Sequence, residues 1–163
     1  MSDIRLIKET DIDCFHAALS SVVLERKYLL TVNPPSKEDT GRFIKRNIEN
    51  NTPQYVAELE NKVIGWADVI AGEKEIIRHV GLLGMGVVSG HRRKGIGQKL
   101  LSAVVEHSWN AGFKRLELEV FASNKGAYAL YEKNGFELEG TKRNSRYMNG
   151  EYEDVYLMAQ CRI

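Results

Sequence analysis

The residues best suited to bind a charged ligand lie in one short segment, in which three cationic residues precede two glycines, Arg92-Arg93-Lys94-Gly95-Ile96-Gly97. A near-continuous apolar run from about Ile77 to Val88 precedes this segment, and an amphipathic run to about Asn110 follows it. Such a strand-to-helix junction presents free backbone N–H groups and a partial positive charge to an anion. Because glycine allows a ligand to approach closely, the segment predicts a cradle for a pyrophosphate.

Two common phosphate-binding loops do not fit these residues. Gly90 and Gly95 have Walker A spacing, but Ile96-Gly97 follow them, so the hydroxyl that would bind magnesium is missing. A dinucleotide-binding turn beginning at Gly84 lacks its third glycine and lies within the apolar run. The alternative that stays open is a solvated basic loop whose glycines serve a tight turn.

Two motifs carry a resemblance to a known family. The cationic segment resembles the Arg/Gln-x-x-Gly-x-Gly/Ala signature of the GNAT superfamily of N-acetyltransferases. Asn124 to Phe136 is similar to the family's Asn-x-x-Ala-x-x-Leu-Tyr-x-x-x-Gly-Phe motif, at the family's usual separation. The stretch from Glu139 to Met158 further resembles a bacterial subgroup that acts on free amino acids or protein N-termini.

Hydrophobic periodicity predicts the elements that must position these motifs. Their order, β α α β β β α β α β β, indicates an α+β or mixed α/β fold, with a mostly antiparallel sheet of six or seven strands and about four helices, as the resemblance also implies. We expect one domain over residues 1–163. The expected strands are Ile4–Ile7, Tyr55–Leu59, Val63–Val69, Ile77–Val88, Leu116–Val120 and two after Phe136, and the expected helices are Ile12–Glu25, one after Ser36, Gly95–Asn110 and Asn124–Asn134.

Local signals predict where these elements begin and end. We expect Thr10 to cap the first helix, Ser36 to cap the second and Gly112 to end the third. Hairpin turns are expected at Glu60-Asn61-Lys62 and at Asn149-Gly150, the strongest turn signal in the chain.

Composition excludes several classes of function. Among 163 residues, 23 Lys and Arg balance 22 Asp and Glu, which argues against a nucleic-acid partner bound through bulk charge. No apolar run approaches the roughly 20 residues of a membrane span, and no signal peptide is visible at the N-terminus. Cys14 and Cys161 provide neither a disulfide framework nor metal-ligand spacing. We therefore expect a cytoplasmic protein without a metal, membrane or nucleic-acid partner.

The resemblance implies acetyl-CoA as the acetyl donor. The pantetheine arm would hydrogen-bond the strand backbone at Met85, Gly86 and Val87, with Asn124 helping to position it. Ala127 lies one helical turn before Tyr131, on the face expected to meet the cofactor. The pyrophosphate would be held by the cationic side chains and backbone amides of Arg92, Arg93, Lys94, Gly95, Ile96 and Gly97.

The family reaction is direct attack by an amine on the acetyl carbonyl. Tyr131 is the expected acid for the leaving thiolate, and its alternative role is a packing aromatic. Many family members carry a carboxylate in the strand before the loop, but residues 80–84 of this chain contain none. His79 is the predicted base because its unperturbed pKa is ~6.5. A water-mediated route stays open, and other nearby candidates are Asp68, Glu73 and Glu75.

The acceptor is expected to be a primary amine of a small molecule such as an amino acid. The resemblance directs attention to Tyr28 and Tyr147, and Trp66 could add an aromatic wall. A ribosomal-protein-type N-terminal acetyltransferase, acting on a peptide N-terminus, is one alternative, and a non-catalytic acyl-CoA sensor is another. The resemblance also leaves open a homodimer, which is common in the family.

Overall fold

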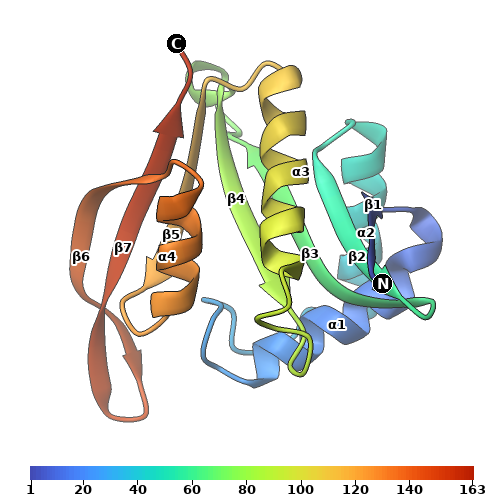
Figure 1. Ribbon diagram of the computed structural model, residues 1–163, viewed down its shortest axis with the longest axis horizontal. Coiled ribbons are helices and arrows are strands. Elements are labelled where there is room, and N and C mark those ends of the chain that lie inside the picture. The colour runs from blue at the N-terminus through green and yellow to red at the C-terminus, as the bar shows by residue number, and fades with distance from the viewer. The chain divides into compact units, whose positions relative to one another are not determined.

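The computed structural model describes all of residues 1–163 and confirms the expected mixed fold (Figure 1). In hydrogen-bonding order the seven strands are β1-β2-β3-β4-β5-β7-β6. β4 pairs with β5 in parallel, while β1–β2, β2–β3, β5–β7 and β6–β7 are antiparallel. The elements are β1 (Asp3–Leu6), η1 (Glu9–Asp11), α1 (Ile12–Leu24), α2 (Lys37–Glu49), β2 (Gln54–Leu59), β3 (Lys62–Ala71), η2 (Glu75–Ile77), β4 (Val80–Val87), α3 (Ile96–Asn110), β5 (Arg115–Phe121), α4 (Lys125–Lys133), β6 (Glu137–Met148) and β7 (Glu151–Cys161).

The chain forms two compact units, and β4 contributes to both. The first unit, residues 1–70 and 84–111, contains β1, β2, most of β3, the second half of β4 and helices α1, α2 and α3. The second unit, residues 71–83 and 112–163, contains the first half of β4, β5, α4, β6 and β7. The single domain expected over 1–163 stays a prediction.

The two faces of β3 in the first unit meet different helices. Gly65 lies against Leu100 and Ile96 of α3. Trp66, the next residue, points to the opposite face and meets Phe15 of α1 edge to face, with ring centroids 5.7 Å apart. This alternation is the normal period of a strand, so even-numbered residues of this part of β3 face the α1 side.

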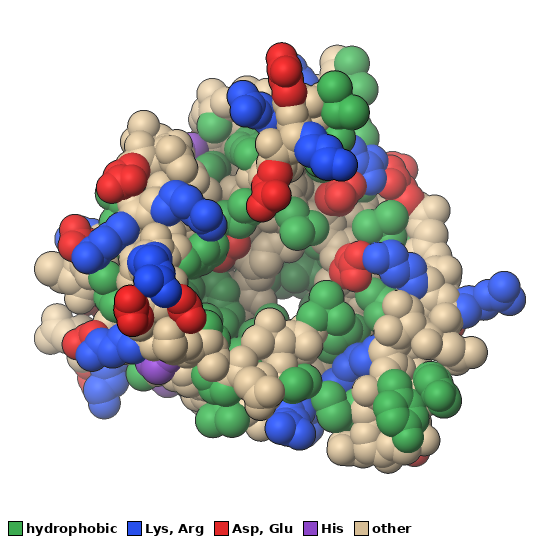
Figure 2. Space-filling model, turned by 180° about the vertical axis from the view of Figure 1, so that it is seen from behind, with side chains coloured by type: hydrophobic (Ala, Val, Ile, Leu, Met, Phe, Trp, Pro, Cys, Tyr) green, Lys and Arg blue, Asp and Glu red, His purple; other side chains and the backbone are tan.

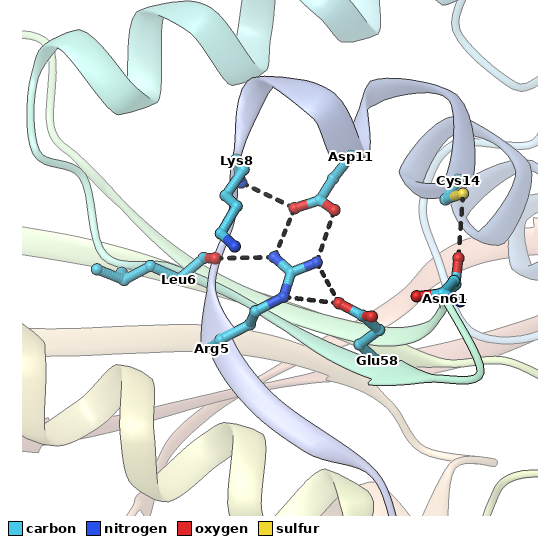
Figure 3. A network of polar contacts seen from close by, with 7 residues as sticks. All are labelled: Arg5, Leu6, Lys8, Asp11, Cys14, Glu58 and Asn61. Carbon is cyan, nitrogen blue, oxygen red and sulfur yellow. Dashed lines mark hydrogen bonds and ion pairs between the residues drawn. The ribbon is translucent and has the colours of Figure 1, made fainter.

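An ionic network joins β1, η1 and β2 in the first unit (Figure 3). Arg5 donates from both Nη atoms to the two carboxylate oxygens of Asp11 at 2.7 Å, and from Nε to Glu58 at 2.7 Å. Asp11 also accepts the Lys8 backbone amide at 2.8 Å. The prediction that Thr10 caps this region is wrong, because the short helix begins at Glu9 and the side chain that satisfies the free amide belongs to Asp11.

We expect Asp11→Asn to lower the free energy of unfolding by about 2 kcal/mol at neutral pH, because Arg5 loses one of its two anionic partners and keeps only Glu58. Burial raises the pKa of Asp11, but the hydrogen bonds from Arg5 and Lys8 lower it by more. The net pKa of Asp11 therefore lies below the ordinary value. The stabilisation is therefore present above the unfolded-state pKa and is lost as the pH falls through the folded-state pKa. Urea unfolding at pH 7 and at pH 3 should show the difference between variant and wild type shrinking in acid.

The matched control for Asp11 is Asp13→Asn, which removes an exposed carboxylate paired with Lys37 at 2.7 Å. An exposed pair contributes little to stability, so this variant should unfold nearly as the wild type does at both pH values. An equal loss in the two variants would contradict the structural role assigned to the network.

The second unit is held by β5, β7 and β6 and contains one of the two hairpin turns expected from the sequence, at Asn149-Gly150. Asn149 and Gly150 have φ of 53° and 84°, as a type I′ turn requires, and connect β6 to β7. Asn124 caps α4 by accepting the Ala127 amide at 3.2 Å. Gly135, with φ of 87°, follows the helix.

Charged side chains of both signs intermingle over the surface that Figure 2 shows. In the second unit, for example, Arg115 donates to Glu139 at 2.8 Å. None of the helices has the length and apolar character needed to cross a membrane.

Candidate active site

The beginning of α3 has the backbone geometry expected of an anion cradle. Gly95 is the N-cap, with φ of 80°, and no side chain hydrogen-bonds to the cap. Gly90 and Arg93, earlier in the loop, also have positive φ, at 85° and 59°. A Cβ at Gly95 would meet no atom within 4 Å. Because the first amides of a helix have no partner within the helix, this open end can receive an anion.

Two of the three cationic side chains lie on the outside of this loop. Arg93 and Lys94 are both exposed. Lys94 donates from Nζ to the Gly90 carbonyl at 2.8 Å, which closes the loop across its own backbone. Both charges can therefore reach an anion at the beginning of α3 without leaving a buried partner unpaired.

Arg92 has a different environment, with partners on three sides within the first unit. Its Nε donates to the Val87 carbonyl at 2.8 Å, and its Nη atoms donate to both carboxylate oxygens of Glu25 at 2.8 and 2.6 Å. The guanidinium also lies 4.4 Å from the ring centroid of Tyr28. The hydrogen bonds from Arg92 lower the pKa of Glu25. Arg92 thus connects the end of β4 to α1 and to a candidate acceptor residue.

Trp66 lies directly against the backbone of β4 at Gly86. Trp66 is only 4% exposed, and a Cβ at Gly86 would fall 2.5 Å from Cη2 of its ring. The Val88 amide donates to the Ile64 carbonyl at 2.9 Å and sets this register. The indole therefore covers the residue predicted to bind the pantetheine arm and is part of the core that includes Phe15 and Tyr28.

We expect Gly86→Ala to lower the free energy of unfolding by about 1–3 kcal/mol, the usual cost of overpacking a core. The indole cannot retreat easily because Phe15 packs on it. The control is Gly84→Ala in the same strand, where a Cβ would meet only an Asp68 oxygen at an ordinary 3.7 Å. Chemical denaturation of both variants measures the difference, and equal midpoints would show that the ring does not constrain Gly86.

Asp68, two residues beyond Trp66, carries a carboxyl group without a hydrogen-bond or ion-pair partner. It is half-buried, and one of its carboxyl oxygens lies 3.7 Å from the position of a Cβ at Gly84. Burial raises the pKa of Asp68 to about 7. The sequence placed Asp68 among four candidate bases, but only the strand register shows that it faces β4.

Tyr131 occupies the buried side of α4 in the second unit. Its ring packs edge to face on Phe136 at 5.9 Å, and the Phe136 amide donates to the Tyr131 carbonyl at 3.1 Å. Burial raises the pKa of the phenol, which keeps its proton through the neutral range. Asn124 and Ala127, the other predicted residues of this motif, form the N-terminal cap of the same helix.

His79 and Tyr147 also belong to the second unit, and both are exposed. His79 immediately precedes β4, and its carbonyl accepts the Lys114 amide at 2.9 Å. Tyr147 is 62% exposed, and its ring packs on that of Tyr152 beside the Asn149-Gly150 turn, with the ring centroids 4.7 Å apart. Of the predicted residues, the first unit therefore brings together Tyr28, Trp66, the end of β4 and the cationic loop.

Comparisons with known proteins identify the family to which the chain is similar. The model of the acetyltransferase (GNAT) family matches residues 21–136. Over 108 residues, 66% of this chain and 67% of the relative, the sequence is 34% identical to the L-amino acid N-acetyltransferase AaaT of Escherichia coli strain K12.

Two solved structures superpose on nearly the whole chain. The ribosomal-protein-alanine N-acetyltransferase of Brucella melitensis has a TM-score of 0.91 and 25% identity, over 98% of this chain and 99% of that one. A phosphinothricin acetyltransferase of Sinorhizobium meliloti, in complex with acetyl-CoA, has a TM-score of 0.91 and 24% identity, over 98% of this chain and 88% of that one. The second likeness speaks to the fold alone.

Proposed function

The chain belongs to the acetyltransferase (GNAT) family, and on that premise we propose that it transfers an acetyl group from acetyl-CoA to the primary amine of a small molecule such as an amino acid. The observation that carries the proposal is the uncapped beginning of α3, where Gly95 has φ of 80° and open space around it. Pyrophosphate fits this geometry because the free amides, Arg93 and Lys94 all present positive charge there.

Acetyl-CoA, when bound, supplies a thioester carbonyl that an amine can attack. In this proposal the backbone of Met85, Gly86 and Val87 binds the pantetheine arm in the manner of an added strand. The amides from Arg93 to Gly97 hold the pyrophosphate. Arg92 keeps its partners Glu25 and Val87 and so fixes the loop. Asn124 and Ala127 hold the beginning of α4, from which Tyr131 projects.

Two proton transfers must accompany the reaction, because an alkyl ammonium loses two protons on forming an amide. We assign the proton donor for the departing sulfur to Tyr131, whose burial keeps the phenol protonated at neutral pH. For the proton that leaves the amine, His79 is the candidate base on the grounds of its residue type, and a chain of water molecules is the alternative.

Tyr28, Trp66 and Tyr147 are the residues that we propose as candidates for binding the acceptor. An amino acid is favoured over other amines because the relative AaaT is named for L-amino acids. The second candidate is a protein N-terminus, favoured by the likeness to a ribosomal-protein-alanine N-acetyltransferase. In either case the aromatic side chains suit an apolar or small acceptor.

The deciding experiment measures acetyl-CoA-dependent thiol release with a panel of L-amino acids and short peptides that differ at the N-terminal residue. Saturable turnover with free amino acids would support the proposal, and turnover with peptides alone would favour the second candidate. Acetyl-CoA binding without turnover on any amine would instead indicate a sensor and contradict both.

We expect Gly95→Val to weaken acetyl-CoA binding by at least about tenfold, or ~1.4 kcal/mol, since a branched side chain would enter the pyrophosphate space. Gly112→Val is the matched control, because Gly112 follows the other end of α3 with φ of 96° and equally open surroundings. The two variants share the backbone penalty of about 1–2 kcal/mol for positive φ. Calorimetric titration with acetyl-CoA should separate them, and equal affinities would show that the cradle is wrongly placed.

We expect Tyr131→Phe to lower kcat by about 100-fold while leaving the Kd for acetyl-CoA unchanged, because only the proton donor is lost. Tyr128→Phe is the control on the same helix, since its ring packs on Tyr156 at 5.5 Å and has no assigned role in catalysis. Steady-state rates and direct binding measure the two effects. A Tyr131→Phe enzyme with normal kcat would leave Tyr131 as a packing residue.

A further inference from the structure

Two glycines leave one face of the second half of β4, the face toward Trp66 and Asp68 of β3, without a side chain of its own. A Cβ added to Gly84 or Gly86 would lie on this face, where it would meet side chains of the neighbouring strand β3. Trp66 lies over Gly86, and Asp68 lies over Gly84 with a carboxyl oxygen 3.7 Å from a Cβ position there. Asp68 thus occupies the place where a side chain of β4 would stand.

We propose that Asp68 is the catalytic base. In this proposal the carboxylate that β4 lacks comes from the neighbouring strand β3. This inference rests on the proposed function, because it needs an amine to deprotonate. Gly84 precedes the predicted pantetheine-binding residues Met85 and Gly86 and is itself exposed. Because Asp68 is itself only half-buried, the proposal has an amine, or one intervening water, reach its carboxyl group beside Gly84.

The surroundings of Asp68 suit a base that must release and regain a proton. Across β2 its register partner is Gln54, whose side chain shares the same face. Gln54 is fully buried, and its carbonyl oxygen accepts from Asn47 of α2 at 2.9 Å. Its Nε2 is buried without a partner and is therefore a donor still available to a neighbouring group.

No charged group balances the Asp68 carboxylate. Gln54 and Asn47 are neutral amides, and Gly84 has no side chain. Desolvation alone acts on Asp68 and raises its pKa to about 7, where a base works best at neutral pH. His79, by contrast, is exposed and lies before the first residue of β4.

The protons balance in this assignment. The substrate ammonium gives one proton to Asp68, and the neutral amine forms the C–N bond as the C–S bond breaks. Tyr131 gives its proton to the departing thiolate, and the second amine proton then restores the Tyr131 phenol. Asp68 then releases its proton to water, so the net products are the amide, the thiol and one proton.

The first test replaces Asp68 with asparagine, which keeps the shape and removes the base. We expect kcat to fall by about 100-fold or more, with unchanged acetyl-CoA affinity, and the rise of kcat with pH near 7 to disappear. Carbon-13 NMR of the carboxyl groups in the free protein should show one aspartate titrating near pH 7 in wild type and not in Asp68→Asn. This readout does not depend on turnover.

The second test moves the carboxylate across the strands. Asp68→Gly combined with Gly84→Asp returns a carboxylate to the same space from β4, where a Cβ meets no backbone atom within 4 Å. We expect this double variant to recover activity and the pH dependence relative to Asp68→Gly alone. A double variant that folds and binds acetyl-CoA but gains no activity would overturn the assignment.

Other outcomes are equally decisive. Three results for Asp68→Asn would show that Asp68 is not the base: an unchanged kcat, a rise of kcat with pH that still occurs near pH 7, or a loss of acetyl-CoA binding. If the rise of kcat near pH 7 is lost in His79→Ala but kept in Asp68→Asn, the base is His79. If the wild type turns over no amine, the proposed function has failed, whereas normal turnover in both wild type and Asp68→Asn refutes only this inference.

Discussion

Trp66 lies so close to β4 that the strand has no room for a Cβ at Gly86, and this contact determines much of the site around it. The ring is packed on its other side by Phe15, so α1, β3 and the proposed cofactor strand are held together by one stack of side chains. Because strand faces alternate, the residue two positions along β3 necessarily faces the same side of β4. That residue is Asp68, and the strand opposite it again carries a glycine. The bare backbone of β4 therefore explains both the glycine-rich sequence and the placement of a carboxyl group above it.

The same packing accounts for the electrostatics of Asp68. A carboxyl group beside a large buried indole, a buried amide and two glycines of β4 loses water and gains no compensating charge. Desolvation of this kind disfavours the charged form and raises the pKa. Asp11 in the same unit shows the contrast, because Arg5 and the Lys8 amide overcome its burial and lower its pKa. One carboxylate is stabilised as an anion within a structural network, and the other is left poised to exchange a proton.

The sequence was most informative where a function depends on backbone conformation. Gly95 and the Ser36 cap could be predicted because a positive φ, or a free amide at a helix end, restricts the residue types that fit there. The roles of Arg92 and Asp68 could not be predicted, because each depends on partners distant in sequence. Glu25 is 67 residues from Arg92, and Gly84 becomes a neighbour of Asp68 only through the register of β3 and β4. Thr10 was predicted wrongly for a different reason: the side chain that accepts the free Lys8 amide belongs to the next residue, Asp11, which Arg5 of β1 also binds.

The arrangement of Arg92 has a consequence for how binding of the two substrates is linked. A single guanidinium holds the Val87 carbonyl at the end of β4, the Glu25 carboxylate at the end of α1 and the ring of Tyr28. These are, in turn, the strand proposed for the pantetheine arm and a side chain proposed for the acceptor. A bidentate guanidinium–carboxylate pair has a narrow geometry that a lysine could not reproduce. The cationic residue that begins the motif therefore binds partners within the protein and holds the strand end and Tyr28 relative to each other. Arg93, Lys94 and the helix amides stay available for the anion of the proposed function.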